Sequence, residues 1–491
     1  MAGVSLVDLL PRGGDGLAVH AAGTDHSWSE LRDRSDDIAC ALADAGVGPG
    51  SVVGVLLPDG ADLVAVLFAV WRAGGVYVPL NPRLTATELG RVVTGVDPVA
   101  IVTTPADEAR FGDRTVVSLS GSRLLTRPGV PGAGRRDPSV ALLSFTSGTT
   151  GAPVAVPLTH ERVLALLDKV IGTLRTGPSS GSPMPNLVPV PLSVWAGIYQ
   201  VLFAFRVGAP VVLMDGFDTR RFADLVRRFA IRSTVLPPAA MVMLVDDEGV
   251  GDLAPLRYVR SIASPLSPLQ ARRFRDRFGI KVLNGYGQTE LGGEVVGWGA
   301  GDAREFGEAK LGSVGRPHAG VEVRTDATGE LWVRTPGVVQ GVEGGDRLSP
   351  DGWFRTGDMA TIDDDGFVWI EGRVSDMINR GGLKVHPAEV EEVLRLSPGV
   401  ADAAVAGVPD DRLGEVPWAW CIPSDPATGL PTPADLESLC REHLAPYKIP
   451  VHFAPIASLP RNEAGKVLKR TLVERASPPG SGPSSLSPGG R

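Results

Sequence analysis

Residues 144–151 read Ser-Phe-Thr-Ser-Gly-Thr-Thr-Gly, a run of hydroxyl side chains and glycines at the end of the apolar stretch Val140–Phe145. The apolar stretch predicts a buried strand, and the run predicts a loop that follows it. Small residues let backbone N–H groups approach a phosphate, and hydroxyls can donate to its oxygens. A flexible turn of the same composition is equally common, so the run alone leaves both interpretations open.

Two common phosphate-binding motifs do not explain this run. No Gly-Lys-[Ser/Thr] follows it, so it is not a Walker loop. The other glycine-rich stretch, Gly46–Gly50, comes after a helical pattern and not between a strand and a helix. A dinucleotide-binding fingerprint is therefore not supported.

Helix and strand patterns alternate on both sides of the run. Ser27–Glu30 is a capping box that opens a helix, and Val52–Leu57 is a short apolar run typical of a buried strand. A helical pattern over Asp218–Phe229 and a strand pattern over Ser233–Leu236 repeat the order. From Gly329 onward, short strands separated by Asp/Gly turns take over. The alternation predicts an α/β protein.

The chain is long enough for more than one domain. Its 491 residues exceed the size of an ordinary single core. A smaller unit begins near Gly372–Asp376, with helices expected over Pro387–Leu396 and Pro433–Leu444. The last residues are almost all Ser, Pro and Gly, which favours disorder. The predicted parts are an N-terminal domain (1–372), a C-terminal domain (373–476) and a disordered tail (477–491).

Composition excludes several classes of protein. A net charge of -8 and the absence of a long basic run argue against a dedicated nucleic-acid binder. Cys40, Cys421 and Cys440 are far apart and lack metal-ligand spacing, which favours buried or half-buried thiols in a reducing cytoplasm. No secretory signal pattern is visible at the start. The most apolar stretch, Leu63–Leu80, is broken by Arg72 and two glycines, so it predicts a helix, a turn and a strand. We expect a cytoplasmic protein without integral membrane association.

Four further groups of residues could carry chemistry. Asn284–Glu290 follows a strand and offers an aromatic face for a base and a carboxylate for Mg²⁺. Gly352–Asp358 ends on a carboxylate that could accept two ribose hydroxyls, here expected at a strand end. The other two groups are Gly372–Gly382 and Pro460–Lys466. Taken singly, three of these groups have a plain alternative: a turn with a core tyrosine for Asn284–Glu290, a solvated aspartate for Asp358, and a surface lysine for Lys466.

Taken together, the five groups resemble one family in order and approximate spacing. The chain is similar to the acyl-adenylate-forming superfamily of AMP-binding enzymes, which includes acyl- and aryl-CoA synthetases, peptide-synthetase adenylation domains and firefly luciferase. The resemblance covers roughly residues 20–475 and includes Val78–Pro82 and Ala263–Leu266. It implies a large N-terminal domain of stacked α/β subdomains with a β-barrel-like subdomain, and a small mobile α+β C-terminal domain.

The resemblance also implies the small molecules and the site residues. The substrates would be a carboxylic acid, ATP and coenzyme A, with Mg²⁺ as cofactor. The residues implied in catalysis are Lys466, Glu290 and Thr146. Those implied in binding ATP or coenzyme A are Thr146, Ser147, Gly148, Thr149, Thr150, Gly151, Ala263, Ser264, Pro265, Asn284, Gly285, Tyr286, Gly287, Thr289, Asp358, Arg373, Gly381, Gly382 and Lys384. The acyl pocket would be lined by Val194, Trp195, Gly197, Gly287 and Gly292, and Mg²⁺ held by Thr149 and Glu290.

Three positions depart from the family pattern. The phosphate loop usually carries a lysine where this chain has Val154, so one cationic contact to pyrophosphate is missing. The hinge residue between the domains is Ser375 in place of the common lysine or aspartate. A histidine that often lines the acyl pocket is replaced by Val194, which makes the pocket less polar.

Several alternatives stay open. The acceptor could be coenzyme A, the thiol of a carrier protein, an amine or another small nucleophile. The missing loop lysine also allows a degenerate relative that binds nucleotide or acyl ligand without turnover. No arginine is obviously placed for a second substrate carboxylate, which favours an aliphatic or aryl monocarboxylic acid. We expect a monomer or homodimer.

Overall fold

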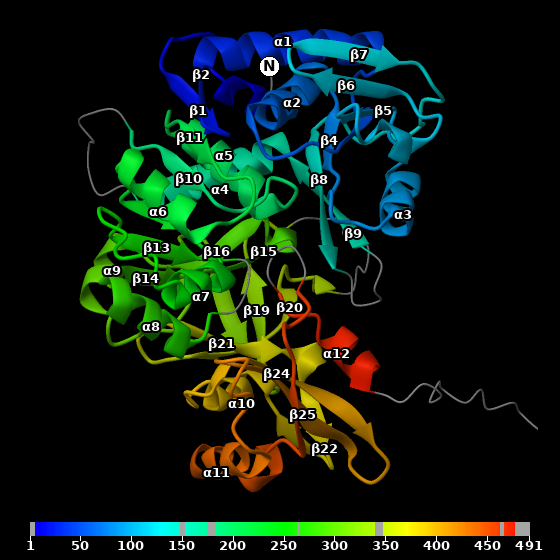
Figure 1. Cartoon of the computed structure of the whole chain (residues 1–491). Helices are drawn as coiled ribbons and strands as arrows, with labels where there is room; N and C mark the ends of the chain where they lie inside the picture. The colour runs from blue at the N-terminus through cyan, green and yellow to red at the C-terminus, as the bar shows by residue number, and fades with distance from the viewer. Residues whose placement is uncertain are drawn as a thin grey trace, which may run out of the picture. The chain divides into compact units, whose positions relative to one another are not determined.

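Helices alternate with strands along most of the chain (Figure 1). The computed structural model describes residues 5–147, 153–174, 183–262, 266–338, 347–461 and 466–476. The chain divides into two units. The larger unit is Met1–Arg324, Trp332–Thr356 and Asp363–Val368, and the smaller unit is Thr325–Leu331, Gly357–Ile362 and Trp369–Arg491. The α/β fold class is confirmed. The domain bounds 1–372 and 373–476 stay a prediction, and the tail 477–491 lies outside the described residues.

The larger unit contains a seven-stranded sheet. Its order is β7 (Arg123–Arg127), β6 (Val116–Ser120), β5 (Ala100–Thr103), β3 (Val52–Val55), β4 (Val76–Pro79), β8 (Val140–Ser147) and β9 (Pro153–Thr159). The inner strands are parallel, and the edge strands β7 and β9 are antiparallel to their neighbours. Strands β3, β4 and β5 are buried throughout, which explains their uninterrupted apolar sequences.

Three more sheets follow in the larger unit. A four-stranded sheet has the order β10 (Asn186–Val188), β11 (Val211–Leu213), β1 (Leu17–Ala21) and β2 (Thr24–Ser27). A parallel sheet contains β12 (Ser233–Val235), β13 (Tyr258–Ser261) and β14 (Lys281–Asn284). An antiparallel sheet contains β15 (Tyr286–Gln288), β16 (Gly293–Gly297) and β17 (Arg316–Pro317). A further sheet has the order β18 (Glu322–Thr325), β19 (Glu330–Arg334), β20 (Phe354–Ile362) and β21 (Val368–Arg373), and the division into units passes through its strands.

The larger unit contains the helices that the sequence predicts at Ser27, within Leu63–Leu80 and over Asp218–Phe229, together with others that it does not predict. They are α1 (Trp28–Asp44), α2 (Ala61–Arg72), α3 (Ala86–Val96), α4 (His160–Leu174), α5 (Trp195–Arg206), α6 (Thr219–Arg228), α7 (Pro238–Asp246), α8 (Pro268–Phe278) and α9 (Ala300–Glu305). Ser27 caps α1 and forms the predicted capping box with Glu30. The apolar stretch 63–80 forms α2, a turn and β4, as predicted. No helix in the described part of the chain is long and apolar enough to cross a membrane.

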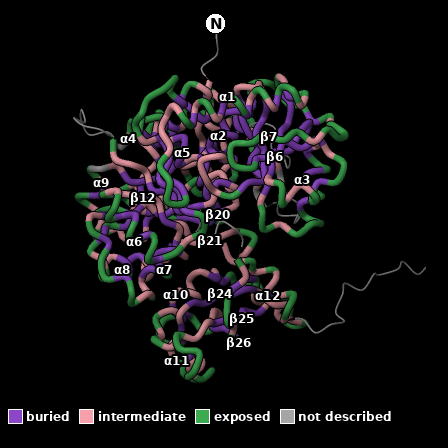
Figure 2. The backbone as a smooth tube through the Cα atoms, turned by 45° about the horizontal axis from the view of Figure 1, so that its top comes forward, coloured by how far each residue is buried: buried purple, intermediate pink, exposed green. Residues whose placement is uncertain are grey.

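The smaller unit is a sheet with helices on both faces. Its strands run β23 (Leu383–Val385), β22 (Ile378–Arg380), β25 (Gly414–Pro423) and β24 (Val400–Asp410), and β26 (His452–Pro455) pairs with β25. Alternate residues of β24 face opposite sides: Ala403 and Val405 pack with α10 (Pro387–Leu394) and α11 (Pro433–His443), while Ala404 packs with α12 (Lys469–Ala476). Figure 2 shows β24 and β25 as buried strands. Thr432 and Asp435 form the predicted capping pair of α11.

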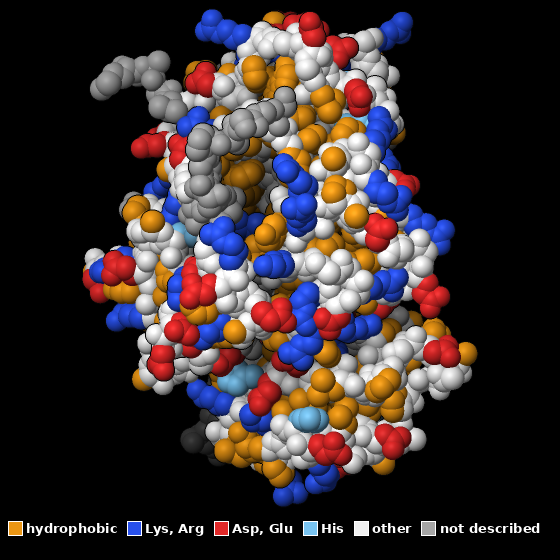
Figure 3. Space-filling model, turned by 90° about the vertical axis from the view of Figure 1, so that its left-hand side faces the viewer, with side chains coloured by type: hydrophobic (Ala, Val, Ile, Leu, Met, Phe, Trp, Pro, Cys, Tyr) orange, Lys and Arg blue, Asp and Glu red, His pale blue; other side chains and the backbone are white. Residues whose placement is uncertain are grey.

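The structure tests the expectation that the cysteines are buried or half-buried. Cys421 and Cys440 are buried as predicted, but Cys40 is exposed. It lies on α1, whose buried side is formed by Leu31, Ser35, Ile38 and Leu42, so helical periodicity turns residue 40 outward. On the surface shown in Figure 3, acidic and basic side chains are interspersed, in keeping with the modest net charge.

Candidate active site

The tyrosine motif begins where a parallel strand ends. Asn284 is the last residue of β14 and is buried opposite Ser261 of β13. The next amide, Gly285 N–H, donates to the carbonyl of Ser261 at 2.8 Å. The chain then enters β15, which carries Tyr286, and a short 3₁₀ turn, η3 (Thr289–Leu291), which carries Glu290. The structure therefore brings the predicted residues of this motif to the carboxyl end of the sheet, where ligands of open α/β sheets bind.

Arg347 is a charged partner of this motif that the sequence did not predict. Its Nη1 lies 3.5 Å from Oε1 of Glu290, and its Nη2 donates to Oε1 of Gln288 at 3.1 Å and to the carbonyl of Thr356 at 2.6 Å. Gln288 in turn donates to the Tyr286 hydroxyl at 3.0 Å. No periodicity or motif surrounds Arg347 in the sequence, so only the folded structure reveals it.

Glu290 is the described residue of the predicted Mg²⁺ site. It is buried, with 9% of its surface exposed. No cluster of three or more His, Cys, Asp or Glu that could hold a metal ion occurs among the described residues. Mg²⁺ commonly binds through one or two carboxylates together with substrate phosphates, so a single glutamate fits an ion that arrives with ATP. The other predicted ligand, Thr149, lies outside the described residues.

The predicted ribose-binding pair comes together in the smaller unit. Arg373 Nε lies 2.7 Å from Oδ1 of Asp358, and the Asp358 side chain is only 6% exposed. The expectation that Asp358 lies at a strand end is wrong, because β20 continues to Ile362. The following residues Met359 and Ala360 are buried, and this apolar run continues the strand past the carboxylate.

The charges of Asp358 and Arg373 also act on Lys466. Its side chain is half-buried. Burial lowers the pKa of the Lys466 ammonium and the positive charge of Arg373 lowers it further, while Asp376 and Asp358 act in the opposite direction. The structure thus brings together Lys466, Asp358 and Arg373, which the sequence had placed in three separate motifs.

Two ion pairs hold the chain on either side of Lys466. Arg461 Nη2 lies 2.5 Å from Asp402 Oδ2, and Lys469 Nζ lies 2.7 Å from Glu391 Oε1. Arg395 joins the two carboxylates, with Nε 2.8 Å from Asp402 and Nη2 3.8 Å from Glu391. We call these five residues the anchor cluster. It ties both flanks of the lysine-bearing segment to α10 and β24.

The predicted thiol-access segment is a tight hairpin in the smaller unit. Gly381 and Gly382 connect β22 to β23 and have φ of 58° and 87°, the conformation that two-residue hairpin turns require. Gly381 N–H donates to the Leu413 carbonyl at 2.7 Å, which fixes the turn. Lys384 is the exposed middle residue of β23.

The predicted acyl-pocket residues lie around the start of α5 and in the tyrosine motif. Val194 caps α5 and is half-buried, as is Trp195, whose ring lies 5.8 Å from that of Tyr199. Gly197 is buried and in tight contact: a Cβ there would lie 2.2 Å from the Pro191 carbonyl oxygen. Gly292 has φ of 82° and ends η3. Glycine at 197 is therefore explained by backbone packing alone.

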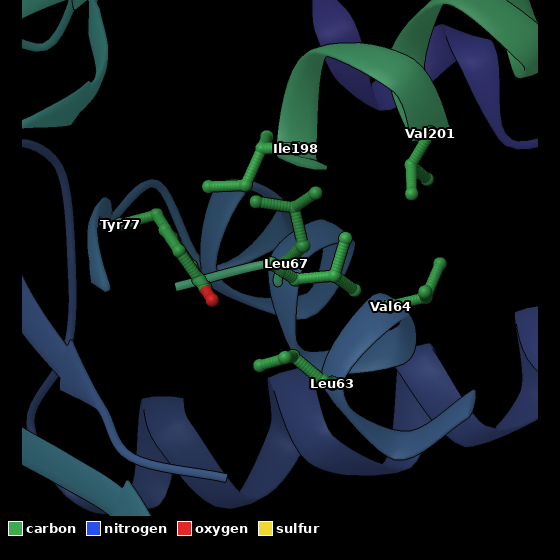
Figure 4. A pocket seen from close by; sticks show the side chains of 7 residues that line it. Leu63, Val64, Leu67, Tyr77, Ile198 and Val201 are labelled. Carbon is green, nitrogen blue, oxygen red and sulfur yellow. The ribbon is translucent and has the colours of Figure 1, made fainter. Parts of the chain in front are cut away.

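A small cavity lies deeper in the larger unit. It is lined by apolar residues of α2 and α5 together with Tyr77 and Leu192, and has a volume of about 10 Å³ (Figure 4). That volume is about what one water molecule needs, far too small for an acyl group. The cavity is a packing gap between two helices.

The phosphate loop and the adenine-binding segment are the least described parts. Gly148–Gly151 and Ala263–Pro265 lie outside the described residues. The prediction that Thr146 and Ser147 lie in the loop is wrong, because their backbone belongs to β8 and pairs with Val154 and Pro153 of β9. Threonine suits a strand, and the antiparallel partner extends β8 past the apolar stretch.

Comparison with known proteins places these residues in context. The AMP-binding enzyme family matches residues 11–342, and the AMP-binding enzyme C-terminal domain matches residues 389–466. The chain is 31% identical to the fatty acid–[acyl-carrier-protein] ligase ScoC of Streptomyces coeruleorubidus, over 93% of each protein. It is 33% identical to a feruloyl-CoA synthase of an Amycolatopsis species, over 93% of this chain and 95% of the relative.

A solved structure gives the same picture of the fold. The amide bond synthetase McbA from Marinactinospora thermotolerans superposes with a TM-score of 0.82 at 28% identity, over 96% of this chain and 99% of that protein. The names of these three proteins describe different reactions: one is an acyl-carrier-protein ligase, one a CoA synthase and one an amide bond synthetase.

Proposed function

The chain belongs to the AMP-binding enzyme family, and on that premise we propose that it activates a carboxylic acid with ATP and transfers the acyl group to coenzyme A. Enzymes of this family use ATP. One observation carries the proposal: Lys466 lies in the electrostatic neighbourhood of the Asp358–Arg373 pair. A lysine, a ribose-binding carboxylate and its arginine are what an adenylate-forming site needs together.

The first step would form the acyl-adenylate. A carboxylate oxygen of the acid attacks the α-phosphorus of ATP, the new P–O bond forms, and pyrophosphate leaves. Lys466 would supply positive charge where negative charge develops between the carboxylate and the α-phosphate. Asp358, held by Arg373 at 2.7 Å, would accept the ribose hydroxyls. Catalysis of such a transfer is mainly positioning and charge stabilisation.

The surroundings of the phosphates would be completed by the tyrosine motif and the loop. Glu290 would hold Mg²⁺, which neutralises phosphate charge when bound. Tyr286 and Asn284 would contact the adenine, and residues 146–151 the β- and γ-phosphates. The loop lysine common in the family is Val154 here. Because this cation is missing, Lys466 would carry a larger share of the charge stabilisation.

The second step would transfer the acyl group. The thiol sulfur attacks the acyl carbonyl carbon, the C–S bond forms, AMP leaves, and the thiol proton passes to solvent. By analogy with the family, the smaller unit would turn so that the Gly381–Gly382 hairpin and Lys384 replace Lys466 at the site. Hinge motion of this kind needs only a few residues to change conformation, and Ser375 is at the expected place. ATP and coenzyme A suggest a cytoplasmic reaction.

A carrier-protein thiol is the second candidate acceptor. It is favoured by the similarity to the acyl-carrier-protein ligase ScoC, which covers 93% of this chain. Both acceptors present the same pantetheine thiol, so the adenylation chemistry is unchanged. An amine or another nucleophile would use the same first step.

The experiment supplies purified protein with ATP, Mg²⁺ and a panel of aliphatic and aryl acids, and follows AMP release with and without coenzyme A. AMP release that requires coenzyme A, with acyl-CoA as product, supports the proposal. Pyrophosphate exchange that coenzyme A does not affect, with acyl transfer to a phosphopantetheinylated carrier, supports the second candidate. The absence of turnover with every acid would indicate a binding protein without activity.

A further inference from the structure

A buried ion pair lies beside the tyrosine motif and takes no part in the mechanism above. Arg260 of β13 contacts Glu294 of β16 through Nη2 and Oε1, and His318 Nε2 lies 3.0 Å from the same oxygen. The three side chains are 17%, 13% and 3% exposed. Burying an ion pair is often no more stabilising than an apolar replacement of the same size. The pair can therefore have a role other than stability.

Glycines of the tyrosine motif make room for this carboxylate. Glu294 pairs directly with Gly287 across the antiparallel strands β15 and β16. A Cβ at Gly285 would lie 3.1 Å from the Glu294 carboxylate, and one at Gly297 would lie 2.2 Å from its Oε1. The carboxylate thus packs against position 285, and the backbone of Glu294 lies beside position 287. The proposed function places the adenylate at the first of these positions and the acyl group at the second.

Tyr199 is influenced by the charges of both Arg260 and Glu294. Tyr199 lies on α5, four residues after Trp195, and its ring contacts the Trp195 ring. Its hydroxyl is buried and has no hydrogen-bond partner among the described residues. Burial raises the pKa of Tyr199, the negative charge of Glu294 raises it further, and Arg260 opposes the shift. The hydroxyl therefore stays protonated and lies within electrostatic reach of both charged groups.

A buried hydroxyl without a partner indicates that something else supplies one. Leaving such a group unsatisfied is unfavourable by about 1–3 kcal/mol, and native proteins contain few of them. The Tyr199 hydroxyl can both donate and accept. A polar atom of a bound ligand would satisfy it.

The charges of the cluster select the kind of ligand group. Arg260 and Glu294 neutralise each other, so the pair offers no net attraction to a second carboxylate or to an ammonium group. A neutral hydroxyl suits it better, because it can donate to Glu294 and accept from Arg260 or Tyr199. An unsubstituted alkyl chain or ring would leave all three polar groups without that contact.

We propose that Tyr199, Arg260 and Glu294 recognise a hydroxyl group on the acyl chain or ring, so that the preferred substrates are hydroxylated carboxylic acids. This inference rests on the proposed function and names its substrate class. It makes the acyl site more polar than Val194 alone suggests.

The test compares acids that differ by one hydroxyl group. Suitable pairs are benzoic and 4-hydroxybenzoic acid, cinnamic and 4-hydroxycinnamic acid, and octanoic and 8-hydroxyoctanoic acid, each assayed by AMP release with ATP, Mg²⁺ and coenzyme A. A site built to hydrogen-bond a hydroxyl discriminates strongly against the analogue that lacks it. For at least one pair, kcat/KM should favour the hydroxylated acid by about tenfold or more.

Tyr199→Phe should remove most of that preference. The variant keeps the ring, and the hydroxyl that it deletes has no partner in the described part of the chain, so the melting temperature should stay the same or rise. Its kcat/KM for the hydroxylated acid should fall by about tenfold or more, toward the value for the unsubstituted acid, which should change less. The matched control is Tyr258→Phe, because Tyr258 is 37% exposed on β13 and its hydroxyl plays no part in the cluster.

The outcomes separate this inference from the proposed function. If the enzyme releases AMP equally with both members of every pair, the inference is overturned and the proposed function stands. If no acid gives AMP, the proposed function fails, and binding of paired acyl-sulfamoyl-adenosines, with and without the hydroxyl, decides the inference. Tighter binding of the hydroxylated analogue by wild type but not by Tyr199→Phe supports recognition; equal or absent binding overturns it.

Discussion

Each unit of the molecule contains a cluster of buried charges, and the two clusters are built differently. In the anchor cluster of the smaller unit, Asp402 Oδ1 accepts from Arg395 Nε at 2.8 Å and from the Ala403 amide at 2.9 Å, and Oδ2 contacts Arg461. Glu391 Oε1 contacts Lys469 and also accepts from the Val405 amide at 2.9 Å. The carboxylate oxygens are occupied by groups of the chain itself.

The cluster of the larger unit is incomplete by comparison. Arg260 and Glu294 are paired, but the nearby Tyr199 hydroxyl finds no partner among the described residues. A cluster whose polar groups all have partners in the chain fixes the geometry of a segment. A cluster with an unsatisfied polar group can form a hydrogen bond with a ligand. We infer that the first cluster positions Lys466, the proposed catalytic lysine, and that the second recognises the substrate.

The largest expected effect concerns the residue that the anchor cluster holds. Lys466→Ala should slow acyl-adenylate formation by about 10²–10³-fold, the usual loss when one stabilising group is removed from a transition state. Transfer from a supplied acyl-adenylate to coenzyme A should be spared. Pyrophosphate exchange measures the first half-reaction and acyl-CoA formation the second.

The matched control for Lys466→Ala is Lys384→Ala on the exposed hairpin. It should slow transfer and spare adenylation, the reverse pattern. Equal loss of both half-reactions in Lys466→Ala would contradict the proposal that Lys466 acts in adenylation and Lys384 in transfer. It would also contradict the proposal that the anchor cluster positions Lys466 for adenylation.

The next test breaks the anchor cluster itself. Asp402→Asn removes the charge that pairs with both Arg395 and Arg461. The free energy of unfolding of the smaller unit should fall by about 4 kcal/mol. Adenylation should fall by about tenfold and transfer less, because the segment with Lys466 loses one of its two anchors. Urea denaturation and the two half-reaction assays measure these changes. Asp411→Asn, at an exposed position of the same unit, should change neither.

A smaller effect is expected in the larger unit. Glu294→Gln leaves a single guanidinium, Arg260, without its carboxylate, and should destabilise the protein by about 2 kcal/mol near neutral pH. Burial favours the protonated form of the carboxyl, but Arg260 and His318 outweigh it and hold the pKa of Glu294 below its ordinary value of 4.5. The stabilisation is therefore present above pH 4.5 and is lost as the pH falls through the lowered pKa.

Denaturation curves of Glu294→Gln and the wild type should accordingly converge in acid. Glu308→Gln is the comparison, since the Glu308 side chain is 76% exposed and pairs with Arg275 at the surface. Such a pair contributes little, so this variant should match the wild type at every pH. If the wild type stayed more stable to unfolding than Glu294→Gln in acid, or gained further stability there, a lowered pKa of Glu294 would be ruled out.

The smallest expected effect is on the pH profile of adenylation. Because burial and Arg373 lower the pKa of Lys466, the lysine should lose its proton below the ordinary pKa of 10.5. The kcat/KM for ATP, which reports the free enzyme, should decline on the alkaline side before that pH. Lys466→Arg should abolish this decline, since a guanidinium keeps its charge. A decline that Lys466→Arg left in place would show that another group titrates.

Local sequence signals predicted much of the fold. The capping boxes at Ser27 and Thr432 are present because they depend on residues three positions apart. The apolar strands β3 and β4 follow from short runs of residues that only a buried sheet accommodates. Boundaries were less accurate: β8 extends through Ser147 because a partner strand from later in the chain pairs with it.

The site was predicted through its motifs, and its supporting contacts were not. Asp358 and Arg373 form the expected pair. Arg347, Arg260 and the anchor cluster join residues distant in sequence, and nothing near them marks their partners. Such contacts depend on how the chain folds back on itself, which local patterns do not encode.

The most direct test of the account is a chase through the adenylate. Protein, ATP and Mg²⁺ are mixed, without an acceptor, with an acid from the panel that supported AMP release. The products are identified by mass spectrometry before and after coenzyme A is added. The account predicts enzyme-bound acyl-AMP and pyrophosphate before the addition, and acyl-CoA with AMP afterwards. ADP and phosphate as products, or acyl-AMP that persists after coenzyme A is added, would contradict it.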